Sequence, residues 1–161
     1  MLNFNSEYQD PISNGLQFCQ DVLAIIMDHF PILGNRLAIN INELSDSFSP
    51  ELFNTELAQS VISVLDFYKD KSLDEWSTRA NNQFPIQISG KTEILNVITE
   101  LTLAQSSQNN EKRILCHLDI NTIPQNQGFR FNKNDVSSFI CEAKKIICNI
   151  INDFEGLDRF E

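Results

Sequence analysis

The longest regular pattern of apolar positions in the chain lies between Asn134 and Phe154. Apolar side chains recur at intervals of three and four residues, the period of one helical face: Val136, Phe139, Ile140, Ala143, Ile146, Ile147, Ile150, Ile151 and Phe154. Asn134 suits the N-cap position, and Gly156 suits a left-handed residue after the last turn. The pattern predicts an amphipathic helix over 134–154 whose apolar face lies across the core.

Other segments show the same helical period. Asp10-Pro11 precedes a stripe that predicts a helix over 11–29, and Ser49-Pro50 precedes a stripe that predicts a helix ending in the charged Lys69–Lys71. Ser72 to Glu75 matches a capping box, which predicts a shorter helix ending near Asn82. Ile94, Val97, Ile98 and Leu101 predict a further helix over 91–106.

Shorter segments alternate apolar and polar residues, as strands do. These alternating runs lie at 37–41, at 84–88 and within 113–131. The helical segments are longer and more numerous, so the chain is predicted to be mainly α. We expect a helical bundle of four to five helices, with at most a small β element around 37–41, 84–88 and 113–131. With 161 residues and no linker, residues 1–161 are predicted to form a single compact acidic domain.

Composition indicates a soluble protein of a reducing compartment. No apolar run approaches the roughly 18 residues of a membrane span, and the N-terminus has no basic region followed by an apolar one. The four cysteines show no C-x-x-C spacing, and Cys141 and Cys148 lie too far apart on one helix to form a disulfide. We therefore expect reduced core thiols and a cytoplasmic location.

The chain carries a net charge of −10, and the charge is uneven. Residues 1–80 contain twelve acidic and four basic residues, a net charge of −8, whereas residues 81–161 have a net charge of −2. Such a field repels phosphate backbones and attracts cationic surfaces, so we expect no direct binding of nucleic acid. A stacking site formed by Phe129, Arg130 and Phe131 would act against this field.

No motif identifies a reaction, a metal site or a cofactor. Ser89-Gly-Lys-Thr92 resembles the end of a phosphate-binding loop, but Pro85 occupies the place where that loop needs its first glycine. A turn at Gly90, with Thr92 capping the next helix, is the simpler interpretation. Asp66, Asp70 and Asp74 have helical spacing, but Lys69 and Lys71 lie between them, which favours a solvated face. We expect neither enzymatic activity nor a cofactor.

Arg113 and His117 are the one pair with a family resemblance. Their spacing resembles the Arg-to-His signature of HEPN ribonucleases, helical proteins in which arginine and histidine serve RNA cleavage. The family places four to six residues between the two, whereas this chain has three, the first of them the apolar Ile114. The resemblance implies a helical ribonuclease, and it is kept as an alternative to a binding function. A third reading is a helical adaptor or chaperone that uses an exposed stripe on the last helix.

The leading hypothesis is a protein-binding inhibitor. A compact acidic domain without a visible active site fits an immunity protein or antitoxin of bacterial type, which masks a basic toxin or nuclease domain. The predicted contact surface contains the acidic residues of the first half and two aromatic residues that would act as anchors if they are exposed: Glu43, Asp46, Glu51, Glu56, Asp66, Asp70, Asp74, Glu75, Trp76 and Tyr68.

Overall fold

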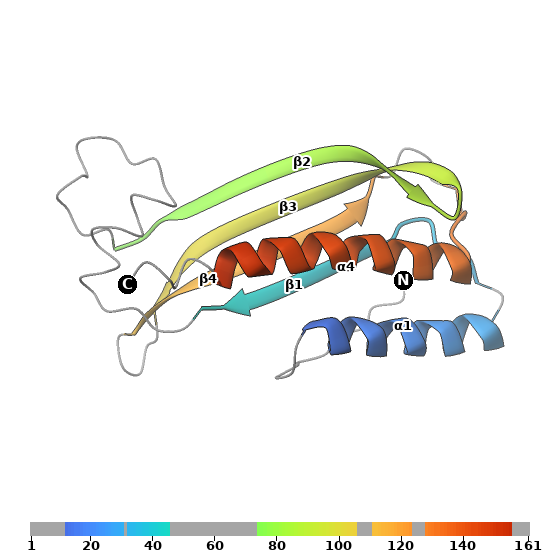
Figure 1. The fold of residues 1–161 in the computed structure, drawn as a ribbon, viewed down its shortest axis with the longest axis horizontal. Helices are drawn as coiled ribbons and strands as arrows, with labels where there is room; N and C mark the ends of the chain where they lie inside the picture. Colours follow the sequence, from blue (N-terminus) through green and yellow to red (C-terminus); the bar gives the residue numbers. More distant parts are fainter. Residues whose placement is uncertain (1–11, 31, 46–73, 106–110, 124–127, 156–161) are drawn as a thin grey trace. The chain divides into compact units, whose positions relative to one another are not determined.

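The computed structural model describes residues 12–30, 32–45, 74–105, 111–123 and 128–155. The described elements are α1 (Ile12–His29), β1 (Ala38–Leu44), β2 (Ser77–Ile88), β3 (Lys91–Gln105), β4 (Lys112–Thr122) and α4 (Lys133–Glu155). The strands form one antiparallel sheet in the order β1-β4-β3-β2 (Figure 1). The expected helical bundle is therefore wrong: the described part of the chain has an α+β fold.

Two predicted helices are strands in the structure. Residues 72–82 and 91–106 were expected to be helical, but β2 begins at Ser77 and β3 extends from Lys91 to Gln105. In β3, which has a strand on each side in the sheet, the consecutive residues Leu95, Asn96 and Val97 are all buried, so burial there does not alternate along the strand. A run that is apolar on both faces lacks the alternation that identifies a half-exposed strand, and its spacing then also fits a helix.

Several other predicted elements agree with the structure of the described residues. Helices were expected at 11–29 and 134–154, and both are confirmed by α1 and α4. The run at 37–41 forms part of β1, the run at 84–88 ends β2, and residues 112–122 form β4. Phe131 does not pair with β4 as expected; instead it forms an isolated bridge with Gly34. The predicted helix after Ser49 lies outside the described residues.

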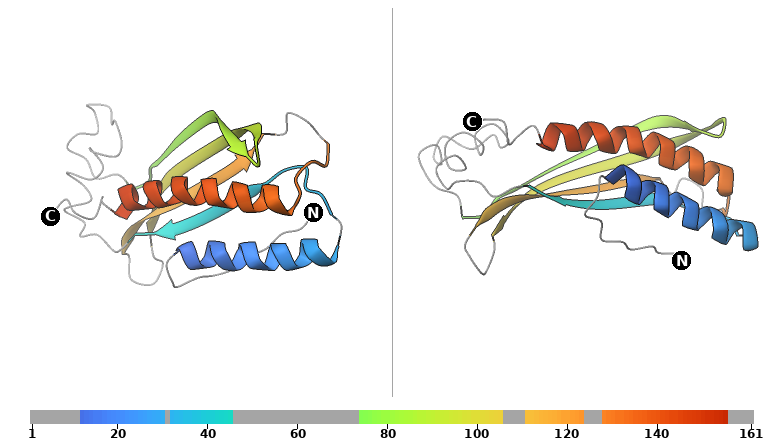
Figure 2. Two further views of the ribbon diagram at one scale, coloured as in Figure 1. Left: turned by 45° about the vertical axis from the view of Figure 1, so that its right-hand side comes forward. Right: turned by 60° about the horizontal axis from the view of Figure 1, so that its bottom comes forward.

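The described residues divide into two compact units. Unit 1 contains Met1–Ile39, Gln83–Asn96 and Ile120–Cys148, and unit 2 contains Asn40–Asn82, Val97–Asp119 and Asn149–Glu161. In each unit, its part of α4 lies on one face of its strands (Figure 2). Neither described helix has the length and apolar character needed to cross a membrane.

In unit 1 the β2–β3 turn contacts the start of α4. Ser89 and Gly90 form the turn with φ angles of 48° and 79°, and the amide of Ser89 donates to the hydroxyl of Ser138. Asn132, rather than the expected Asn134, caps α4: its Oδ1 accepts from the amides of Asn134 and Asp135, and Asp135 Oδ2 accepts from the amide of Asn132. This reciprocal pair is a capping box.

The core of unit 2 lies between its strands and the end of α4. Its buried apolar side chains come from β3, β4, α4 and the residue before β2: Trp76, Val97, Ile114, Cys116, Leu118, Ile151 and Phe154. In the part of β4 that belongs to unit 2 the buried residues Ile114, Cys116 and Leu118 share one parity, so the residues between them, such as His117, point to the opposite face, as does Asp119. We call that opposite face of the unit 2 strands the open face.

Candidate functional site

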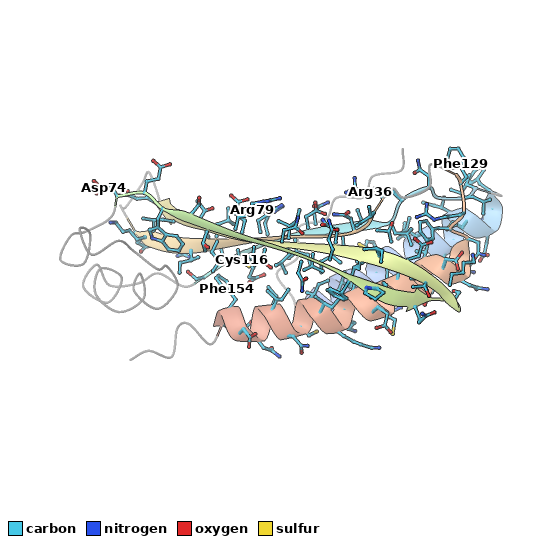
Figure 3. The ribbon with its side chains drawn as sticks, turned by 90° about the horizontal axis from the view of Figure 1, so that it is seen from above. Arg36, Asp74, Arg79, Cys116, Phe129 and Phe154 are labelled. Carbon is cyan, nitrogen blue, oxygen red and sulfur yellow. The ribbon has the colours of Figure 1, made fainter. Side chains whose placement is uncertain are left out.

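The pairing of the strands determines which side chains are neighbours on the open face. In the β1–β4 pair, the amide of Ser45 donates to the carbonyl of Ile114, which places Asn42 opposite His117. In the β2–β3 pair, the amide of Leu103 donates to the carbonyl of Trp76, which places Arg79 opposite Glu100. Figure 3 shows Arg79 on the open face, whereas Cys116 and Phe154 lie between the strands and α4.

A row of polar residues therefore crosses unit 2. In the β3–β4 pair, the amide of Ile123 donates to the carbonyl of Ile94, which places Glu100 beside His117. The row is therefore Asn42, His117, Glu100 and Arg79, one residue from each strand. We call these four residues the polar row. Adjacent members are separated by the strand spacing of about 4.8 Å. The neighbouring row contains Asn40, Asp119, Ile98 and Asn81.

The polar row contains charges without partners among the described residues. The ion pairs of the described residues include neither Arg79 nor Glu100, although the two lie opposite each other. His117 Nδ1 lies 2.8 Å from Asn42 Oδ1. Because that oxygen only accepts, Nδ1 carries the proton, and a neutral His117 ring then keeps Nε2 as an acceptor. The row thus offers a guanidinium, a carboxylate and an oriented imidazole to a ligand.

The acidic contact surface expected from the sequence is only partly described. Glu43 lies on the strand face that α4 covers and is half-buried; burial, and secondly the charge of Glu155, raise its pKa. Asp74 and Glu75 are exposed ahead of β2, on the far side of the sheet from β1. Trp76 is only 7% exposed, so it packs in the core and does not meet the condition for an anchor. Asp46, Glu51, Glu56, Asp66, Tyr68 and Asp70 lie outside the described residues.

Arg113 and His117 do not form a joint site. Both lie on β4, four residues apart, which separates their backbones by about 13 Å at strand rise. Arg113 Nη1 donates to the carbonyl of Ser45 at 3.4 Å, and its Nη2 pairs with Glu111 at 3.3 Å. The strand around them differs from the helix that the HEPN resemblance implies. Through the strand register, the arginine in the same row as His117 is Arg79.

In unit 1 the most constrained charged group is Arg130. Its Nε and Nη2 donate to the two carboxylate oxygens of Glu93 at 3.0 and 2.9 Å, and its Nη1 donates to the carbonyl of Asn35 at 2.8 Å. The guanidinium also lies 4.3 Å from the centre of the Phe131 ring. The bond to Glu93 raises the pKa of Arg130. These contacts fix the segment around Phe131 against the segment around Gly34.

Large apolar side chains are exposed on these same two segments. Leu33 directly precedes Gly34, Phe129 lies two residues before Phe131, and the amide of Gly34 donates to the carbonyl of Phe131 at 2.8 Å. We call this group the apolar patch; its members are 42–71% exposed, and they are Phe30, Ile32, Leu33 and Phe129. Grouped exposure of large apolar side chains is typical of interaction sites.

Cysteine and metal chemistry find no support in the described residues. The cysteines are free. Burial, and secondly the charge of Glu43, raise the pKa of Cys116 to about 11, so its thiol stays protonated at neutral pH. Within the described ranges, no group of three histidine, cysteine or acidic side chains is arranged to hold a metal ion.

Sequence reasoning missed most of the polar row and the apolar patch. His117 was singled out, but Asn42, Glu100 and Arg79 become its neighbours only through pairings between distant strands. The common parity of 79 and 81 in one run, and of 117 and 119 in another, was the available signal. Phe129 was expected either in a strand within 113–131 or in a base-stacking site, and neither interpretation predicts an exposed anchor.

Comparison with known proteins adds no relative. No protein-family model, no curated protein and no solved structure matches this chain.

Proposed function

We propose that the chain is a protein-binding inhibitor of the immunity-protein or antitoxin class, which acts in the cytoplasm and binds a basic partner. The observation that carries the proposal is the apolar patch, four large side chains that are each exposed on the two segments joined by the Gly34–Phe131 bridge. In protein interfaces a few residues, often aromatic, supply most of the binding energy. The net charge of −10 supports a cationic partner through long-range attraction.

The rigidity of the patch favours binding. Arg130 fastens the Phe129 segment to Glu93 on β3 and to Asn35 beside the bridge. A segment whose backbone is already held in place loses little conformational freedom when a partner covers it, so less binding energy is spent on ordering. Phe129 is the most exposed large apolar residue in the described part of the chain, and we expect it to be the main anchor.

The adaptor hypothesis depends on the apolar stripe of the last helix. It required an exposed apolar stripe on the last helix, but Phe139, Ala143 and Ile147 of that stripe are buried in α4. The patch lies elsewhere, around the bridge between Gly34 and Phe131.

The test is capture of a basic partner from native lysate, followed by binding kinetics with purified variants. Phe129→Ala and Ile32→Ala should each raise the Kd at least tenfold, because each removes a large anchor. Ile25→Ala is the matched control for Ile32, since it removes the same exposed residue type from α1, outside the patch. Equal affinities for Phe129→Ala and the wild type would contradict the placement.

Two charge-reversal variants test the electrostatic part of the proposal. Glu100→Lys and Glu142→Lys change the net charge equally, one on the open face and one on α4. Both variants should associate with a basic partner more slowly than the wild type at low salt, and this difference from the wild type should vanish at high salt. Association rates that do not depend on salt would contradict a cationic partner.

A second candidate function rests on the bond between Asn42 and His117. An oriented imidazole in one row with a carboxylate and a guanidinium that form no ion pair with another described residue is an arrangement suited to proton transfer on an anionic substrate. His117 would move the proton, and Arg79 would hold the anion. Incubating the protein with a panel of phosphodiesters tests this: activity lost in His117→Ala and Arg79→Ala but kept in Arg113→Ala would favour it. A wild type without activity would exclude it for those substrates.

A further inference from the structure

The sheet has two edge strands, and they differ in how well they are protected. β2 carries Pro85 and Arg79 at positions whose backbone groups point away from β3. A proline removes an edge donor and a charged side chain opposes pairing, so both protect an edge from strand addition. β1 has the sequence Ala-Ile-Asn-Ile-Asn-Glu-Leu, without proline, lysine or arginine.

The backbone groups at the outer edge of β1 can be identified from its pairing with β4. The amide of Thr122 donates to the carbonyl of Leu37, and the amide of Ser45 donates to the carbonyl of Ile114. Odd-numbered residues of β1 therefore bond to β4, and even-numbered residues direct their N–H and C=O groups outward. The even-numbered residues Ala38, Asn40, Asn42 and Leu44 are exposed, and their outward backbone groups have no hydrogen-bond partner within the ranges that the structure describes.

We propose that β1 pairs with β1 of a second copy of this chain, in antiparallel orientation, to form a dimer with a continuous sheet. The argument for a second copy is that β1 is complementary to itself. In one register all four outward residues find partners: Ala38 faces Leu44 of the second copy, and Asn40 faces Asn42. Each of these pairs exchanges two hydrogen bonds, as hydrogen-bonded antiparallel pairs do.

The side chains agree with this register. On the open-face side, Leu44 (47% exposed) lies opposite the small Ala38, and asparagine lies opposite asparagine. On the other face Ile41 lies opposite its own copy, an aliphatic β-branched pair. The two Glu43 side chains each face Ile39, so no like charges lie directly opposite each other. In the alternative register that pairs Glu43 with Glu43, two like charges would lie directly opposite each other.

The experiment combines sedimentation equilibrium with amide hydrogen exchange on the full chain. The wild type should sediment as a dimer, with slow exchange at Asn40, Asn42 and Leu44 that becomes fast on dilution. The amides of Ile41 and Glu43 bond to β4 and should stay protected at every concentration. Asn40→Pro should give a monomer, because it removes an outward donor without touching the β4 ladder.

Asn81→Pro is the matched control. Asn81 lies in the same cross-strand row at the opposite edge, with its N–H directed away from β3, so this variant should remain dimeric. Asn40→Lys provides a second way to block the β1 edge should proline disturb the strand, and it should also be monomeric. A wild type that is monomeric at about 200 µM, a concentration within the µM–mM range in which unpaired strand edges associate, would overturn the proposal. A dimer unchanged by both Asn40 variants would also overturn it.

Discussion

Arg130→Ala is the most informative single substitution for the stability of unit 1. The guanidinium of Arg130 and the carboxylate of Glu93 are 18% and 12% exposed, and they meet through two hydrogen bonds of 2.9 and 3.0 Å. Removing the arginine leaves Glu93 charged and poorly solvated without its partner. It also removes the bond to the carbonyl of Asn35 and the contact with the Phe131 ring. We therefore expect unfolding to become easier in this variant.

The magnitude follows from the burial of the pair. Removing one partner of a buried ion pair costs about 3–5 kcal/mol, whereas exposed pairs are worth about 0–1 kcal/mol. The Arg130–Glu93 pair belongs near the lower end of the first range because both side chains keep some solvent contact. For a chain of this size, about 3 kcal/mol corresponds to a Tm lowered by roughly 6–12 °C.

Urea unfolding followed by far-UV circular dichroism measures the effect. Lys133→Ala is the matched control, since it breaks a pair with Asp28 in which the side chains are 42% and 57% exposed. The free energy of unfolding of Lys133→Ala should fall by less than about 1 kcal/mol. Arg130→Met combined with Glu93→Leu should recover much of the stability, because no unpaired charge remains. If Arg130→Ala and Lys133→Ala cost the same, the inference from burial is refuted.

Three further predictions concern single groups. Burial acts to raise the pKa of Asp135, but bonds from the amide of Asn132, from Lys91 and from Ser89 outweigh it and lower the pKa below 3.8. Its stabilisation is therefore complete above about pH 4 and is lost as the pH falls through the lowered value, so a pH series of Tm should lose this acid-dependent step in Asp135→Asn. Because Glu43 has a raised pKa, its charge is unfavourable at neutral pH: Glu43→Gln should raise the Tm at pH 7, and the gain should shrink as the pH falls through the raised pKa. Gly90→Ala should lower the free energy of unfolding, measured in urea, by about 1–2 kcal/mol. The loss would come from backbone strain alone, because φ is +79° at this position and an added Cβ meets nothing within 4 Å. A urea midpoint equal to that of the wild type would contradict this prediction.

The sequence predicts those elements whose apolar pattern has one interpretation. In α4 the stripe from Val136 to Phe154 has one polar side, and the predicted helix agrees with the structure. In β3 the consecutive residues Leu95, Asn96 and Val97 are all buried, and apolar residues continue on both parities, which erases the alternation on which the recognition of a strand depends. The capping signal of Ser72 to Glu75 is local, whereas Trp76 is placed by its backbone bond to Leu103 across the sheet.

The sites were harder to predict than the elements for the same reason. Two hydrogen-bond partners of Arg130, Glu93 and the carbonyl of Asn35, come from distant parts of the chain. The polar row joins four strands, so no window of sequence contains it. Charge composition suggested an acidic surface, but composition does not show that Glu43 lies under α4 while Asp74 and Glu75 are exposed ahead of the opposite edge strand.

The strand order has a consequence for the synthesis of the chain. β1 pairs with β4, and the contact between Asn42 and His117 spans 75 residues. At a translation rate of about 5–20 residues per second, β1 waits roughly 4–15 s for β4 to leave the ribosome. The β2–β3 hairpin closes locally and much sooner, within about 1–10 µs once both of its strands are available. The nascent chain therefore passes through a stage in which the hairpin exists and β1 is a lone strand, and ribosome-associated chaperones have several seconds to bind it.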